Sequence, residues 1–275
     1  MKFCLTLIVV VALSAPAHAQ TDSMAAGKER SLCGTIGKDG RTALRAAGVI
    51  FSAPLRWDGN DWLLASGIVV TTGAVSLLDR DVSTLMDNNR TPLNDDLQKV
   101  AVQYGDGLNI LVLVAGTYAT GLLIDDDWLR ETAVLTGTSV LISGTISTLA
   151  KMAVGRARPY AGLGNHHFHP FNLKDEFHSF PSGHTMTAFS VSGILAARIK
   201  NPWASVGLYG LATLSSVSRL YSRDHWLSDI VFSAAYSTAI AHSIVDWFEK
   251  GEGRNADAGL RIVPGPGYVV VRYGF

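Results

Sequence analysis

Six stretches of the chain are rich in Leu, Ala, Val and Ile, with Gly, Ser and Thr interspersed. They cover approximately residues 62–78, 108–124, 132–150, 185–198, 203–217 and 229–247, and they contain few charged or amide side chains. Each stretch is longer than ten residues and lacks the turn residues that separate short strands, a pattern that favours helices over strands. The sequence therefore predicts an all-α fold, a six-helix bundle.

The segments on either side of these stretches have a different character. Residues 20–57 are polar and then weakly amphipathic, with glycines that interrupt any early helix, so we expect an extension packed on the domain. Near the C-terminus, a Pro-Gly-Pro-Gly run precedes a strand-like end from Tyr268 to Tyr273. The expected organisation is a signal peptide at 1–19, an N-terminal extension at 20–57, a helical domain at 58–248 and a C-terminal tail at 249–275.

The N-terminus is typical of a secretory signal. A charged Met1-Lys2 start is followed by an apolar run and then by Ala17-His18-Ala19, the small-residue pattern of a cleavage site. Cleavage after Ala19 would export the mature chain to the periplasm or cell envelope. The mature chain would keep one cysteine, Cys33, and could form no internal disulfide.

The composition excludes a general electrostatic attraction to nucleic acids. The 275 residues include 23 Lys and Arg against 23 Asp and Glu, and no basic run marks a polybasic surface. Hydrophobic residues make up 48% and charged residues 17%, which is apolar for a soluble protein. We expect no nucleic-acid partner, and a charged substrate must be held by a few local side chains.

Three motifs bring together cations, histidines and one carboxylate. In order they are K-x6-R-P from Lys151 to Arg158-Pro159, P-S-G-H from Pro181 to His184, and S-R-x5-H-x3-D from Ser218-Arg219 through His225 to Asp229. Each motif lies where a predicted helix ends or begins. Since such ends meet at the same face of an up-down bundle, we expect the motifs to converge.

The positively charged side chains in these motifs are suited to bind a phosphate group. Phosphoryl transfer spreads negative charge over the equatorial oxygens, and Lys151, Arg158 and Arg219 could stabilise that charge. Ser182 and Gly183 lie where a helix begins, so free backbone N–H groups and the serine hydroxyl could add donors.

The two histidines are suited to act as a nucleophile and a general acid. A carboxylate four residues after His225 lies on the same helical face, so Asp229 could accept one ring N–H and leave the other nitrogen free to attack. The sequence therefore predicts His225 as the nucleophile, Asp229 as its orienting group and His184 as the general acid.

Over roughly residues 60–247 the chain resembles the type 2 phosphatidic acid phosphatase and vanadium haloperoxidase superfamily, with every motif position present in order. The resemblance implies an all-helical domain and a metal-independent phosphatase that needs no cofactor and works through a phosphohistidine. It assigns catalysis to His225, His184 and Asp229, and phosphate binding to Lys151, Arg158, Ser182, Gly183 and Arg219.

Other interpretations remain open. The same motifs could hold vanadate in a haloperoxidase, or the chain could be a non-enzymatic, anion-binding membrane bundle. Taken one at a time, the cations could be ordinary helix-end charges and Ser182 a simple helix cap. His166-His167-Phe168-His169 offers zinc-ligand types, but its spacing fits no usual closed site, so we expect a substrate-facing loop and no metal.

The hydrophobic pattern is compatible with two different membrane topologies. The run between His184 and Arg198 is shorter than the roughly 20 residues that a span needs. Three crossings from an outside start would also put the motifs in the cytoplasm. We favour a periplasmic bundle resting on the inner membrane over six true spans, although the positive Arg198-Ile199-Lys200 turn supports the spans. The expected substrate is a phosphomonoester, a lipid phosphate or a pyrophosphate.

Overall fold

The computed structural model describes residues 32–251, 261–265 and 268–272. The predicted signal peptide lies outside these residues. Within them the helices are α1 (Leu32–Ser52), α2 (Gly59–Val75), α3 (Asp79–Asn88), α4 (Pro92–Ala101), α5 (Gly107–Leu123), α6 (Asp127–Val154), α7 (Gly183–Ile199), α8 (Pro202–Tyr221) and α9 (Leu227–Glu249). Strands β1 (Arg261–Gly265) and β2 (Tyr268–Arg272) form an antiparallel hairpin.

The all-α prediction is confirmed. The six apolar stretches correspond to α2 and α5 to α9, while α1, α3 and α4 were not predicted as helices. Helix α1 continues through Gly34, Gly37 and Gly40 because it packs on α6 and α9, where Ala46 is fully buried. Here tertiary packing outweighs the low helix propensity of glycine.

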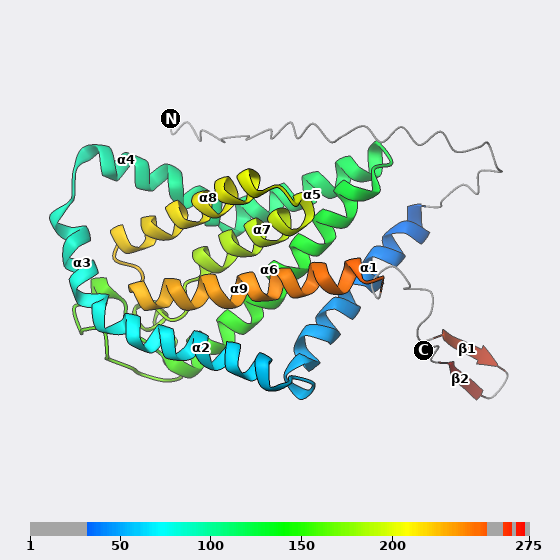
Figure 1. The fold of residues 1–275 in the computed structure, drawn as a ribbon, viewed down its shortest axis with the longest axis horizontal. Helices are drawn as coiled ribbons and strands as arrows, with labels where there is room; N and C mark the ends of the chain where they lie inside the picture. Colours follow the sequence, from blue (N-terminus) through cyan, green and yellow to red (C-terminus); the bar gives the residue numbers. More distant parts are fainter. Residues whose placement is uncertain (1–31, 252–260, 266–267, 273–275) are drawn as a thin grey trace.

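Helix α6 runs through the middle of the bundle and packs against α5 and α7, while α7 also packs on α8 and α9. Helices α2, α3 and α4 follow one another around the outside, with α2 alongside α9 (Figure 1). The main apolar cluster includes Leu135 and Ile142 of α6, Ile194 of α7 and Ile244 of α9. It occupies the end of the bundle away from the three motifs.

The rest of the bundle interior is lined by small polar side chains. The buried serines within the helices are Ser139, Ser143, Ser147, Ser190, Ser192, Ser215, Ser216, Ser218, Ser228, Ser233 and Ser237. Several donate to a carbonyl of the preceding helical turn, as Ser233 does to Asp229 at 2.6 Å. Small residues allow close approach of helices, and a Cβ on Gly193 of α7 would lie 2.7 Å from the Ala241 Cβ of α9.

Two helical segments within the described residues are long and apolar enough to cross a membrane, Gly59–Asn88 and Asp127–Val154. The pair Pro92–Gly105 and Gly107–Leu123, bent by 49°, would make a third. Helix α2 buries no residue and exposes Trp62, Leu63 and Val70. These features indicate membrane association. By length and composition there are two or three candidate spans among the described residues, fewer than the six of one expectation.

The close contact between α7 and α9 makes Gly193 sensitive to added volume. We expect Gly193→Ala to lower the free energy of unfolding by about 1–3 kcal/mol, because the new methyl group would overlap Ala241. Gly207→Ala in α8 is the matched control, since its Cβ would meet nothing within 4 Å. Thermal unfolding of both variants in detergent checks this, and equal stabilities would contradict it.

Candidate functional site

The three motifs meet at one end of the bundle, where α6 and α8 end and α7 and α9 begin. Gly155 ends α6 with a positive φ of 59°, and a Cβ there would lie 2.0 Å from the His169 carbonyl oxygen. Only glycine fits this turn. The turn directs the chain so that Arg156 and Arg158 follow at the motif end.

His225 is buried, with 4% of its surface exposed. Its Nδ1 lies 2.6 Å from the Ser179 carbonyl oxygen, which can only accept, so Nδ1 carries the proton and Nε2 does not. We expected Asp229 to accept this N–H, but its Oδ2 lies 3.8 Å from Nδ1. The tautomer is thus set by a backbone carbonyl, with the Asp229 carboxylate beside it.

Asp229 has no exposed surface and is held by three donors. Oδ1 accepts from Arg156 Nη1 at 2.5 Å, and Oδ2 accepts from Ser179 Oγ at 2.5 Å and from the Trp226 N–H at 2.8 Å. Burial alone would raise the pKa of Asp229, but His225, Arg156 and Ser179 outweigh it and the pKa is lowered. Asp229 therefore stays ionised beside His225.

Arg156 joins Asp229 to a second buried carboxylate, that of Asp79 at the start of α3. Its Nη2 donates to Asp79 Oδ2 at 2.6 Å and its Nε to the Asn165 carbonyl at 2.9 Å. Asp79 also accepts from the N–H and hydroxyl of Ser228, at 2.9 and 2.8 Å. The motifs specify neither Arg156 nor Asp79. Arg156 could be suspected from its place inside K-x6-R-P, but no sequence signal marks Asp79.

The cations of the motifs lie around the same site. Lys151, in the last turn of α6, donates to the His178 carbonyl at 2.7 Å. Arg158 and Arg219 both bind the carboxylate of Asp224, Arg158 through Nη1 at 3.1 Å and Arg219 through Nη2. The charges of Lys151 and Arg158 act on His225. The structure thus brings together the three predicted cations and adds Asp224, which the sequence interpretation did not include.

The start of α7 differs in part from the expectation. Ser182 is fully buried, its Oγ accepts from the Thr185 N–H at 3.4 Å as the helix cap, and its own N–H donates to Ser233 Oγ at 2.8 Å. The serine hydroxyl therefore caps the helix, as in the alternative interpretation. The half-buried Gly183 and His184 place their N–H groups in the first helical turn, where the helix itself offers no acceptor.

Both histidines are shifted towards the neutral form. Burial lowers the pKa of His184 to about 4, with further lowering by the charges of Arg219 and His225. Burial also lowers the pKa of His225, and Lys151 and Arg158 add to this while Asp229 opposes it. The charge of His225 is among the causes that lower the pKa of His184, which indicates that the two rings lie near one another.

The histidine-rich loop packs on itself. His167 and His169 lie against Phe177, with ring centroids 6.0 and 5.3 Å away, and His178 Nε2 contacts the Asn172 carbonyl at 2.8 Å. Across the ranges that the structure covers, no three His, Cys, Asp or Glu side chains are grouped so that they could hold a metal ion.

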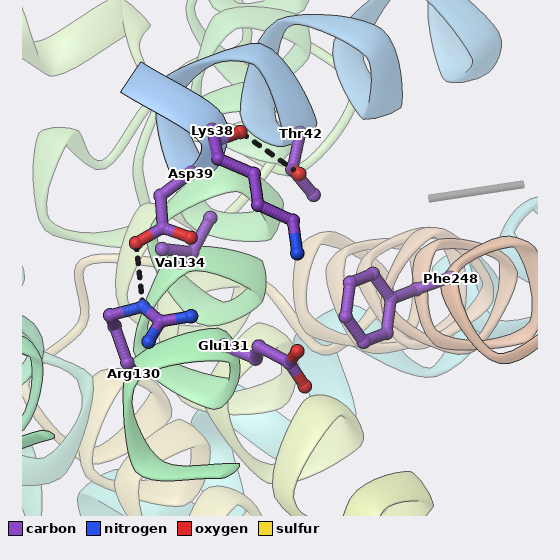
Figure 2. A pocket seen from close by; sticks show the side chains of 7 residues that line it. All are labelled: Lys38, Asp39, Thr42, Arg130, Glu131, Val134 and Phe248. Carbon is purple, nitrogen blue, oxygen red and sulfur yellow. Dashed lines mark hydrogen bonds and ion pairs between the residues drawn. The ribbon is translucent and has the colours of Figure 1, made fainter. Parts of the chain in front are cut away.

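A separate pocket lies where α1, α6 and α9 meet (Figure 2). It is lined by Lys38, Asp39, Thr42, Arg130, Glu131, Val134 and Phe248. Arg130 Nε donates to Asp39 Oδ2 at 2.8 Å, so the two charges already neutralise one another. Some twenty residues of α6 separate this pocket from Lys151, about 30 Å at the rise of an α-helix. It is therefore not part of the histidine site.

Comparison with known proteins agrees with this architecture. Residues 132–252 match the sequence model of the PAP2 superfamily. The lipid A 1-phosphatase of Porphyromonas gingivalis is 32% identical over 96 residues, 34% of this chain and 19% of that protein. The lipid A 1-phosphatase of Rhizobium etli is 33% identical over 104 residues, 36% of this chain and 43% of that protein. The chain thus spans less than half of the length of these relatives.

Among solved structures, the first transmembrane PAP2 type phosphatidylglycerolphosphate phosphatase from Bacillus subtilis aligns with a TM-score of 0.53 and 19% identity. The alignment covers 68% of this chain and 94% of that one, and at this identity it concerns the fold. The resemblance to the type 2 phosphatidic acid phosphatase superfamily, expected from the motifs, is confirmed.

The buried contact between Arg156 and Asp79 should contribute strongly to stability. Asp79→Ala would leave part of the Arg156 charge unpaired in the interior, and we expect it to lower the free energy of unfolding by about 3–5 kcal/mol. Asp81→Ala, an exposed aspartate of the same helix, should change it by less than about 0.5 kcal/mol. Denaturant titration in detergent measures both, and similar values for the two variants would contradict the assignment.

Proposed function

We propose that this protein is a metal-independent phosphatase that hydrolyses a lipid phosphate through a phosphohistidine on His225. The observation that supports it best is the Nδ1–H bond of His225 to the Ser179 carbonyl, since it leaves Nε2 unprotonated. The three cations Lys151, Arg158 and Arg219 lie around the same histidine pair. A neutral imidazole beside clustered cations is suited to attack a phosphate.

The first step forms a bond between His225 Nε2 and phosphorus and breaks the bond from phosphorus to the ester oxygen. The leaving alcohol takes a proton from His184. The cations and the first-turn N–H groups of α7 hold the phosphoryl oxygens while their charge redistributes. In the second step His184 takes a proton from water, which attacks phosphorus, breaks the P–N bond and releases inorganic phosphate.

The protonation states of His225 and His184 suit these two reaction steps. The lowered pKa of His225 keeps it neutral near pH 7, as a nucleophile must be. His184 has a pKa of about 4 in the protein alone, so it is neutral there at the same pH. A doubly charged phosphate beside it favours the protonated ring, so that His184 gains its proton together with the substrate.

A lipid is the substrate class that the surroundings favour. Two or three segments could cross a membrane, and both relatives described above are named for a lipid phosphate. At the motif end, the loop between α6 and α7 exposes Phe171 and Leu173, with 75% and 80% of their surfaces accessible. We propose that this loop contacts lipid and that the site acts on the outer face of the inner membrane, after export directed by residues 1–19.

The nucleophile assignment predicts a large loss on substitution. His225→Ala should lower phosphate release from phosphatidate or lipid A in detergent by about 10³-fold or more, because no other group replaces the attacking nitrogen. His242→Ala is the matched control, since His242 is exposed on α9 and contacts Tyr209. Release by the unmodified protein should persist with a chelator. Full activity of the His225→Ala variant would contradict the proposal. Loss of phosphate release by the unmodified protein on chelation would also contradict it.

The two histidines predict different pH profiles for kcat/KM and kcat. The fall of kcat/KM on the acid side should lie below pH 6.5, since the pKa of free His225 is lowered. The fall on the basic side follows His184, so it should lie at least about one pH unit higher in kcat than in kcat/KM, because bound phosphate raises that pKa.

A His184→Asn variant is the control for this profile. It should lose the basic-side fall in kcat but keep any effect of the substrate's own ionisation. Basic-side falls at the same pH in kcat and kcat/KM of the unmodified protein would contradict the assigned role of His184.

A further inference from the structure

Asp224 precedes His225 in the turn between α8 and α9, and its carboxylate binds both arginines of the motifs. Oδ1 accepts from Arg158 Nη1 at 3.1 Å, and Oδ2 accepts from Arg219 Nη2 and from the Ser222 hydroxyl. The Arg158 and Arg219 side chains are both 14% exposed. Two guanidinium groups thus converge on one carboxylate, and the charge of Arg158 acts on His225 and that of Arg219 on His184.

A carboxylate and a phosphate need the same donors. Both anions accept from the outer N–H groups of arginine, often from two at once. The Nη atoms that should hold the phosphate are those that bind Asp224. Asp175 adds a second contact of this kind, accepting from Arg158 Nη2 at 2.8 Å, but it is 71% exposed and does not reach Arg219.

We propose that Asp224 is a specificity-determining residue that competes with phosphate for Arg158 and Arg219. A substrate phosphate must displace its carboxylate, which weakens the binding of every anion that lacks further contacts. A lipid phosphate regains affinity through its apolar part, whereas inorganic phosphate does not. Asp224 therefore favours the release of inorganic phosphate over its retention. This inference depends on the proposed function, because it takes the two arginines as the phosphate-binding groups.

The Asp224 carboxylate can move away from the two arginines without disturbing the helices. It lies in a turn in which Arg223 has a positive φ of 62°, between the last residue of α8 and the first of α9. Its carboxylate contacts only arginines and a serine hydroxyl of the same turn among the contacts described. By contrast, Asp229 is fixed by buried donors on both oxygens and serves a different purpose.

A purely positioning role for Asp224 gives the opposite prediction. If Asp224 served only to orient the two arginines, its removal would scatter the guanidinium groups and weaken phosphate binding. If it competes, its removal frees the donors and strengthens binding. The sign of the change in phosphate affinity therefore separates the two roles.

The test measures binding of inorganic phosphate by the full chain carrying His225→Ala, so that turnover plays no part. Adding Asp224→Asn should lower the dissociation constant of phosphate by about tenfold, since an amide keeps the shape but loses the charge. The midpoint of thermal unfolding in a phosphate titration reports this constant. Asp175→Asn in the same background is the matched control, with a smaller decrease expected because it contacts one arginine.

An unchanged or larger dissociation constant in Asp224→Asn would overturn the inference, and so would an absence of phosphate binding in every variant. Asp224→Ser replaces Asp224→Asn if the latter does not fold, with the same expected direction. Failure of the proposed function would instead appear as an absence of phosphate release by the unmodified protein. The binding comparison decides the role of Asp224 without reference to that assay.

Discussion

The guanidinium group of Arg156, held between the buried carboxylates of Asp79 and Asp229, is the contact on which the site depends. It lies just after the turn that ends α6 and joins the start of α3 to the start of α9. Two carboxylates without exposed surface would be costly in the interior unless a cation satisfied both. Arg156 therefore fixes Asp229, and Asp229 in turn holds Ser179, whose carbonyl sets the tautomer of His225.

The two ends of the bundle interior differ in the side chains that line them and in what those side chains do. At one end, Leu135, Ile194 and Ile244 form an apolar cluster that stabilises the packing of α6, α7 and α9. Towards the other end, small serines line the interior, and the cations and histidines lie at the helix termini or in the short segments next to them. Helix α2 packs on α9 without burying any residue fully, and it presents apolar side chains such as Trp62, Leu63 and Val70 to its surroundings. This arrangement lets a membrane-associated protein keep a polar site at one end.

Much of this architecture could be predicted from the sequence because it depends on local patterns. Long apolar stretches gave the six main helices, and motifs at helix ends gave the convergence of Lys151, His184 and His225. The rest depends on contacts between distant segments. Nothing in the local sequence links Asp79 to Arg156, since 77 residues separate them. The sequence likewise cannot predict that a backbone carbonyl is the partner of His225, because every residue carries such a carbonyl. Helix α1 was missed because packing, rather than propensity, forms it.

The most direct test of the account is to trap the covalent intermediate on His225. His184→Asn, given an ester whose alcohol leaves without a proton, should still form the P–N bond but hydrolyse it slowly, because no base activates water. Rapid quenching at alkaline pH, proteolysis and mass spectrometry should then find one phosphoryl group on the peptide that contains His225. A phosphoryl group on another residue, or phosphate release by this variant at the full rate with no phosphorylated peptide, would contradict the account.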